Sequence, residues 1–138
     1  MSGLVRTSEA ANLAIHATAI MASRPAQSVT TALMAEGLKA SEAHLAKVMQ
    51  RLTKAGLVTG TRGPGGGFQL TQPAGKISLR EVYEAIEGRL EVERCMLTSP
   101  VCSKPDCPLG SLFARLSDDA MKTLGKTTLA DVELPIKT

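Results

Sequence analysis

The chain has 138 residues, of which 43% are hydrophobic and 2% are aromatic. This length suits a single domain, and a core built from Leu, Val, Ile, Met and Ala favours helices over a sandwich of strands. No apolar run approaches the roughly 18 residues that a membrane-spanning helix needs, and the N-terminus lacks the pattern of a signal peptide. We therefore expect a cytoplasmic protein with no membrane partner.

The net charge of +3 is unevenly distributed along the chain. Residues 38–80 carry seven basic side chains against Glu42 alone, whereas residues 81–138 carry seven basic and ten acidic side chains. A basic middle segment favours a polyanionic partner such as nucleic acid. In a cytoplasmic protein, three cysteines indicate metal or redox chemistry rather than a disulfide framework.

Helical patterns dominate the first half of the chain. A first helix is predicted from Thr7 or Ser8 to before Pro25, and a second, short helix from about residue 30 to residue 38. Ser41 is expected to cap a third helix that ends at Gly56. Apolar residues recur on one face of this helix, and basic residues recur on another. The apolar set is Leu45, Val48, Met49 and Leu52, and the basic set is Lys47, Arg51 and Lys54.

A hairpin and two more helices follow. Residues 57–61 and 68–71 have the pattern of short strands, and the glycine-rich run 62–67 between them is typical of a hairpin tip. Ser78 and Glu81 form a capping-box pattern at the start of a fourth helix that ends at Gly88. A long helix over 109–125 carries an apolar stripe wide enough for a dimer interface.

These elements predict a mainly α fold with a small β-hairpin wing, in the order of a winged helix-turn-helix. We expect a DNA-binding domain over 1–88 and a cysteine-bearing loop over 89–108. A long dimerisation helix with a C-terminal tail is expected over 109–138.

The run from Ser41 to Val58, followed by Arg62-Gly63-Pro64-Gly65-Gly66-Gly67-Phe68, resembles the Rrf2 family of bacterial regulators of the IscR and NsrR type. In such proteins the third helix enters the major groove of DNA and the wing approaches the minor groove. Lys39 stands in the turn where the family often has a glycine. The resemblance implies a DNA-binding surface made of Ser41, Ala43, His44, Lys47, Arg51 and Lys54 on the helix, and of Arg62, Gly63, Gly65 and Gly66 on the wing.

Within this surface the resemblance and the residue types indicate separate roles. The first turns of the helix usually reach base edges, whereas Arg51 and Lys54 suit phosphates. Arg62 is expected in the minor groove, because a narrow groove concentrates negative potential and favours an inserted guanidinium. The alternative is a winged helix used only for protein contacts.

The predicted loop holds all three cysteines, and prolines stand between or beside them. The cysteines are Cys95, Cys102 and Cys107, and the prolines are Pro100, Pro105 and Pro108. Prolines stiffen a loop that has to hold thiolates around a metal. Three cysteines alone do not complete a common zinc site.

Cluster-bearing members of the family bind an iron–sulfur cluster through three cysteines of this loop, and the resemblance implies the same cofactor here, as 2Fe–2S or 4Fe–4S. It further implies a fourth ligand from the first helix of the partner subunit, with His16 the first candidate and Glu9 the second. The alternative for His16 is a packed histidine with a backbone hydrogen bond. The alternatives for the cysteines are three reduced surface thiols, or a zinc or thiol-only sensor.

We expect a homodimeric, DNA-binding transcriptional regulator that acts as a repressor and senses redox state, iron–sulfur status or nitric oxide through the cluster. The alternative is a cluster-free regulator of the same family, controlled by a protein partner or by thiol oxidation. An enzyme is not expected. The glycine run 63–67 leads into Phe68 and a strand rather than into the lysine and helix of a phosphate-binding loop, and no nucleophile has a matched base.

Overall fold

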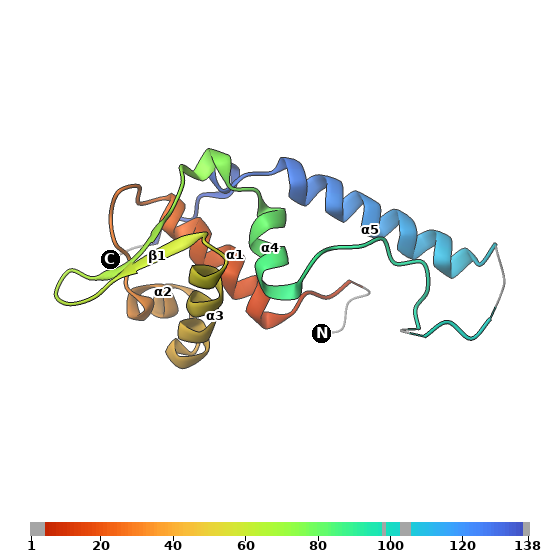
Figure 1. Cartoon of the computed structure of the whole chain (residues 1–138), viewed down its shortest axis with the longest axis horizontal. Coiled ribbons are helices and arrows are strands. Elements are labelled where there is room, and N and C mark those ends of the chain that lie inside the picture. The colour runs from red at the N-terminus through yellow and green to blue at the C-terminus, as the bar shows by residue number, and fades with distance from the viewer. Residues whose placement is uncertain (1–4, 98, 103–105, 137–138) are drawn as a thin grey trace.

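The computed structural model describes residues 5–97, 99–102 and 106–136. Within these ranges the helices are α1 (Glu9–Ala22), α2 (Thr31–Leu38), α3 (Glu42–Lys54), α4 (Leu79–Glu87) and α5 (Pro108–Lys126). The strands are β1 (Val58–Thr61) and β2 (Gly67–Leu70), and two 3-10 turns cover Ala74–Lys76 and Leu129–Val132. The order of the elements confirms the mainly α fold with a β-hairpin (Figure 1).

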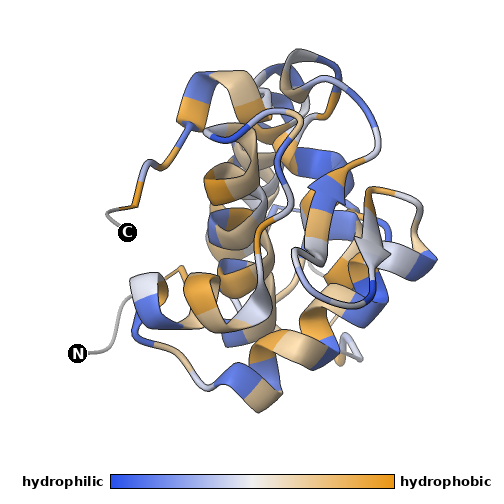
Figure 2. Ribbon diagram, turned by 90° about the vertical axis from the view of Figure 1, so that its left-hand side faces the viewer, coloured by the Kyte–Doolittle hydropathy of each residue, from blue (hydrophilic) through white to orange (hydrophobic). Residues whose placement is uncertain are grey.

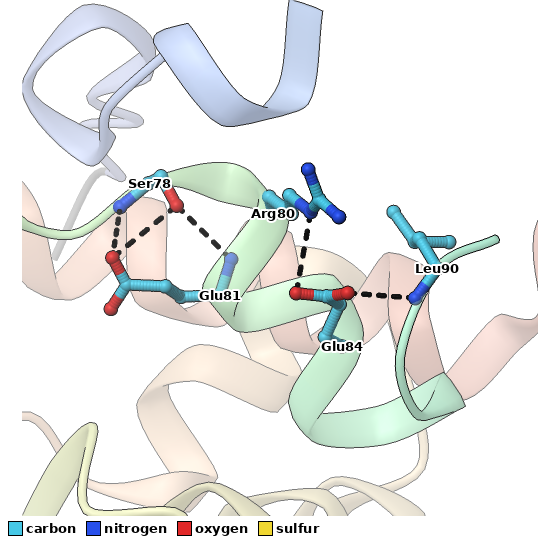
Figure 3. Close-up of polar contacts among 5 residues, drawn as sticks. All are labelled: Ser78, Arg80, Glu81, Glu84 and Leu90. Carbon is cyan, nitrogen blue, oxygen red and sulfur yellow. Dashed lines mark hydrogen bonds and ion pairs between the residues drawn. The ribbon is translucent and has the colours of Figure 1, made fainter. Parts of the chain in front are cut away.

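The first four helices each begin at a serine or threonine whose side chain accepts a hydrogen bond from the backbone three residues later. These caps are Ser8, Thr30, Ser41 and Ser78. They satisfy N–H groups that a helix leaves without a partner in its first turn. At Ser78 the reciprocal contact of a capping box is also made, because the Ser78 N–H donates to the Glu81 carboxylate at 3.4 Å (Figure 3).

The core is built around α1, which packs against α2, α3 and α4. Alanines make up much of its buried surface, and such small side chains let neighbouring helices approach closely. Thr18 is the buried polar residue of this core, and its hydroxyl donates to Ala14 O at 2.8 Å, so it keeps a hydrogen-bond partner. Figure 2 shows apolar and polar positions interleaved along the helices, as expected for elements that share one core.

The hairpin is anchored to the segment that precedes α2. β1 and β2 are antiparallel, and Phe68 exchanges two backbone hydrogen bonds with Val29, at 2.8 and 2.9 Å. Gly67 has φ +144°, and a Cβ there would lie 2.7 Å from Val29 O. Only glycine allows the two backbones to come this close, so Gly67 fixes the base of the wing against the helix-turn-helix.

α5 extends away from the domain as an arm, and the described residues 95–97, 99–102, 106 and 107 lie near its far end (Figure 1). After α5 the chain runs back onto the domain. The Leu134 N–H donates to Ala19 O at 3.0 Å, and Arg24 Nη2 donates to Ile136 O at 3.2 Å. The described part of the C-terminal tail therefore packs on α1 and the segment after it. Across the described ranges we find no helix with the length and apolar character needed to span a membrane.

Candidate DNA-binding surface and cysteine loop

The turn between α2 and α3 contains a lysine in the left-handed conformation. Lys39 has φ +54° and ψ +44°, and its N–H donates to Glu36 O at 3.2 Å. Glycine is the usual residue in this position after a helix, because its lack of a Cβ avoids a clash with the backbone. The turn is thus formed although Lys39 replaces the glycine that the family often has.

α3 presents an exposed polar face next to its buried apolar one. The buried residues are those predicted from the spacing: Leu45, Val48, Met49 and Leu52. Ala43, Lys47 and Lys54 are exposed and follow one another along one side of the helix, with the capping residue Ser41 also exposed at its start. An exposed basic face on the second helix of a helix-turn-helix is suited to entering a DNA groove.

A second edge of α3 is turned toward α1 and α4. His44 Nδ1 lies 3.9 Å from Glu9 Oε1, and Arg51 Nη2 donates a hydrogen bond to Ile86 O. Residues 44 and 51 are seven positions apart, so they share this edge. These two contacts involve residues for which the sequence predicted other roles. Glu9, a candidate cluster ligand, lies beside the predicted recognition helix, and Arg51, predicted to bind phosphate, has a partner within the chain.

The wing tip carries an exposed arginine on a tightly folded backbone. Arg62, Gly63 and Gly65 are exposed, and the Gly66 N–H donates to Gly63 O at 2.9 Å. A Cβ on Gly66 would lie 2.5 Å from Thr61 O, and Gly63 and Gly65 have φ of +89° and +76°. Glycine is therefore required by the fold of the tip itself. Figure 1 shows α2, α3 and this hairpin gathered at one end of the molecule.

The cysteine segments lie at the opposite end, where the chain enters α5. Cys95 and Cys107 are half-buried, and Cys102 is exposed. Cys107 occupies the position before the first turn of α5, and the Leu97 N–H lies 3.4 Å from Cys95 Sγ. A Cβ on Gly110 would lie 2.5 Å from Arg94 O and 3.7 Å from the Cys107 Cβ. Gly110 thus lets the segment that bears Cys95 lie directly against the start of α5, near Cys107.

The donor set of this loop fits an iron–sulfur cluster by its chemistry, since thiolates are the usual ligands of such clusters. Its geometry is less complete. Among the described residues, no group of three His, Cys, Asp or Glu side chains is close enough to hold a metal ion. The chain between Cys102 and Cys107 includes residues 103–105, among them Pro105, which lie outside the described residues.

His16 lies on the exposed side of α1, one helical turn after the exposed Asn12. Its Nδ1 is 2.6 Å from Asn12 O. A carbonyl oxygen can only accept, so Nδ1 is the donor in this contact. The backbone hydrogen bond expected for a non-ligand histidine is present, but the side chain is not packed inside the core. The described segments that carry the cysteines of the same chain lie near the far end of α5, away from α1 (Figure 1).

An open groove of about 310 Å³ runs between α4, α5 and the N-terminal segment. Its apolar lining includes Tyr83, Leu90, Phe113, Leu116, Ala120 and Leu124. Burial raises the pKa of the Tyr83 phenol above its usual value, and the Glu87 and Glu93 carboxylates add to the rise. Part of the stripe predicted for a dimer interface therefore faces an open groove.

On the solvent side of α5, Lys122 pairs with Asp118 at 2.9 Å, and this hydrogen bond raises the pKa of the Lys122 ammonium. The pair joins residues four positions apart on one helix. It stabilises α5 locally and takes no part in the sites described above.

Comparison with known proteins identifies the chain. The sequence model of the family described as Rrf2, iron-dependent transcriptional regulator, matches residues 7–133. The chain belongs to the Rrf2 family. Rrf2 proteins are transcriptional regulators rather than enzymes, which confirms the expectation that this chain is not a catalyst.

Two curated relatives of this Rrf2 chain are named as helix-turn-helix transcriptional regulators. YwgB of Bacillus subtilis is 32% identical over 107 residues, which cover 76% of this chain and 69% of YwgB. IscR of Cronobacter sakazakii is 34% identical over 92 residues, which cover 67% of this chain and 57% of IscR. The match therefore spans little more than half of the IscR protein.

Solved structures confirm the Rrf2 fold. CymR, the global cysteine regulator of B. subtilis, has a TM-score of 0.76 at 23% identity, covering 94% of this chain and 97% of CymR. IscR of T. potens has a TM-score of 0.73 at 21% identity, covering 93% of this chain and 85% of that one. The winged helix-turn-helix with its long final helix is thus shared across most of both chains.

The sequence did not indicate three features of the Rrf2 chain described above. They are the bond from Arg51 to α4, the approach of Arg94 to Gly110, and the packing of residues 133–136 on the domain. The approach of Arg94 to Gly110 had a weak signal in the sequence, since a glycine in an otherwise helical pattern often marks a close packing contact. The other two depend on contacts between elements that are distant in sequence.

Proposed function

We propose that this chain is a homodimeric repressor that binds operator DNA through α3 and the wing. The observation that carries the proposal is the exposed basic side of α3, with Lys47 and Lys54, at the same end of the molecule as the exposed Arg62 of the wing (Figure 1). Membership of a family of transcriptional regulators supports it. This role requires a cytoplasmic location, as expected from the sequence.

The contacts divide by position along the surface. Ser41, Ala43 and His44 lie at the start of α3, where side chains reach base edges in the major groove. Lys47 and Lys54 contribute phosphate contacts, which give affinity more than sequence choice. Arg62 enters the minor groove while the wing glycines, Gly63, Gly65 and Gly66, keep the backbone compact enough to follow it.

DNA binding is tested with a duplex selected from a random library by the wild-type protein. The double variant Lys47→Ala/Arg62→Ala is expected to lose at least 100-fold in affinity, because each charged contact contributes about 1–3 kcal/mol in such interfaces. Lys126→Ala is the matched control, since Lys126 is exposed at the end of α5, outside the proposed surface. Unchanged affinity of the double variant would reject the proposal.

We further propose that Cys95, Cys102 and Cys107 hold an iron–sulfur cluster, with His16 of the partner subunit as the fourth ligand. Two observations support this assignment. Gly110 seats the Cys95 segment beside Cys107, and the exposed His16 uses Nδ1, not Nε2, in its hydrogen bond to Asn12 O. Metal-binding histidines commonly donate their second N–H to a backbone carbonyl in this manner.

In this arrangement the chain's own residues would link signal to operator. The thiolates of Cys95, Cys102 and Cys107 would hold the cluster when it is bound, and this ligation would order the loop between α4 and α5. An ordered loop fixes how the two DNA-binding domains of a dimer are spaced against half-sites roughly 34 Å apart. A change in loop order alters that spacing, and with it operator affinity.

One observation favours a second candidate, a cluster-free regulator that responds to thiol oxidation or to a protein partner. No trio of potential ligands comes together within the part of the chain that the structure describes. Similarity in fold to CymR, the global cysteine regulator of B. subtilis, is compatible with this candidate. In that case the half-buried Cys95 and Cys107 act as thiols.

Anaerobic purification followed by iron and sulfide assays separates the two candidates. The cluster proposal expects iron and sulfide in wild-type protein and their loss in Cys95→Ser and Cys107→Ser. His16→Ala is expected to weaken cluster retention, whereas His44→Ala, the matched histidine control on α3, keeps the wild-type iron content. Colourless wild-type protein without iron or sulfide would favour the cluster-free regulator.

A further inference from the structure

The C-terminal end of α4 is held by polar contacts from three directions. A helix leaves its last carbonyls without partners inside the helix, and the Arg51 guanidinium of α3 donates to one of them, Ile86 O. The Ser8 hydroxyl, at the start of α1, donates to the Glu87 carboxylate. Within the loop that follows, the Leu90 N–H donates to Glu84 Oε2 at 2.7 Å (Figure 3). A cation at this end also complements the negative pole of the α4 dipole.

Two side chains of α3 reach this corner of the domain. Arg51 and His44 lie on one edge of the helix, seven residues apart, and both meet the corner where α1 begins and α4 ends. His44 is half-buried at this corner, whereas Arg51, like Lys47 and Lys54, stays largely exposed while its guanidinium reaches Ile86 O. An arginine is suited to such a contact, because its planar guanidinium keeps several donors in a fixed arrangement.

We propose that Arg51 is a positioning residue that clamps α3 to the end of α4 and so sets the angle at which α3 meets the major groove. It does not serve as a phosphate contact. Because α4 leads through Gly88 directly into the cysteine loop, the clamp also joins the DNA-reading helix to the start of that loop. The inference rests on the proposed role of α3 in DNA binding.

The two roles of Arg51 differ in their salt dependence. Each lost phosphate contact reduces the slope of log affinity against log salt by about 0.9, whereas a lost clamp leaves the number of neutralised phosphates unchanged. Arg51→Met removes the charge and the donors but keeps an unbranched side chain. Lys54→Met is the matched control on the same helix, and it is expected to flatten the slope.

The measurement titrates each variant between about 50 and 200 mM KCl, on the selected duplex and on a scrambled duplex of equal length. For Arg51→Met we expect the wild-type slope, an unchanged affinity for the scrambled duplex and about tenfold weaker binding to the selected one. Arg51→Lys, which keeps a donor of similar reach, should restore most of the preference. A residue that only stabilises the fold would leave the ratio of the two affinities unchanged.

A flatter slope in Arg51→Met, matching Lys54→Met, would overturn the clamp in favour of a phosphate contact. An unchanged slope with an unchanged affinity ratio would overturn it as well. Hydrogen exchange provides a readout without DNA: the Gly88 and Leu90 amides should exchange faster in Arg51→Met than in Lys54→Met. If the wild-type protein bound no duplex at all, the proposed function would fail, and this exchange comparison alone would then decide the clamp.

Discussion

Lys39 adopts a backbone conformation that is unfavourable for a residue with a side chain. Its φ of +54° places it in the left-handed region, which costs an L-residue roughly 1–2 kcal/mol. Glycine at this position would remove the cost. Part of the gain would be lost again, because glycine loses more conformational freedom on folding. The remaining difference gives a measurable prediction for the helix-turn-helix.

Lys39→Gly is expected to raise the free energy of unfolding by up to about 1 kcal/mol, or the Tm by about 2–5 °C at fixed protein concentration. Thermal unfolding followed by circular dichroism measures the change. Lys39→Ala is the control, because it removes the same charge and keeps the Cβ. Equal Tm values for the glycine and alanine variants would show that the left-handed turn is not strained.

At the same scale, the three cysteines and His16 differ in what surrounds them. Cys95 and Cys107 are half-buried near the start of α5, whereas Cys102 and His16 are exposed. Exposure of His16 suits the proposed ligand that serves another subunit, since the segments that carry its own chain's cysteines lie at the far end of α5 (Figure 1). Iron and sulfide contents of the cysteine variants and of His16→Ala therefore test the loop and α1 separately.

At the scale of elements, α5 contains two glycines that play different parts. A Cβ on Gly110 would lie 2.5 Å from the backbone oxygen of Arg94, a contact that forces the backbone to move. A Cβ on Gly125 would meet the flexible Arg80 side chain at 3.8 Å, an ordinary contact. In both places alanine favours the helix itself by about 1 kcal/mol over glycine.

We therefore expect Gly125→Ala to stabilise the protein and Gly110→Ala to destabilise it, despite the identical chemical change. In Gly110→Ala, the displaced segment should also expose Cys95, which increases its rate of labelling by a thiol-reactive dye several-fold. Thermal unfolding and labelling kinetics check the two effects. Equal stabilisation by both substitutions would mean that the Cys95 segment does not rest on α5 in solution.

At the scale of the whole molecule, the rest of the chain covers little of the surface of α5. Gly110 is its one buried residue, and the apolar Phe113, Leu116 and Leu124 line an open groove. Apolar surface of this kind is stabilised when a second copy covers it. A dimer built on α5 also gives the two recognition surfaces that a two-fold operator requires.

Leu116→Glu is expected to weaken self-association at least tenfold, because a carboxylate would be buried in the dimer interface without a partner. Sedimentation velocity measures the effect. Ser111→Glu adds the same charge at an exposed position on the other side of α5 and should leave the dimer intact. A wild-type protein that sediments as a monomer, or a Leu116→Glu variant that remains fully dimeric, would contradict an interface on α5.

Much of the fold could be predicted because its signals are local. The caps Ser8, Ser41 and Ser78 each bind a backbone N–H three residues later, so the residue type and the boundary coincide. The apolar spacing in α3 likewise gave its buried face correctly. The predicted helix over 109–125 differs from α5 by one residue at each end. Such features need no knowledge of distant parts of the chain.

The candidate site was less predictable. The sequence identified Arg51 as basic and on the polar side of α3, and a phosphate role followed from that alone. Its partner within the chain, Ile86 O, is 35 residues away and has no local signal. The contact between Glu9 and His44 and the seat of Arg94 on Gly110 also join residues from different elements of the chain. Periodicity defines the faces of a helix, but it does not say which neighbour meets each edge.

The sequence by itself determined the helices, the glycine-tipped wing, the basic segment and the cysteine-bearing loop, because hydrogen bonds and periodicities within a few residues specify them. The tertiary structure decided how α3 is turned, where the segment bearing Cys95 rests and where residues 133–136 pack. Those outcomes depend on contacts between elements brought together only by burial of the shared core.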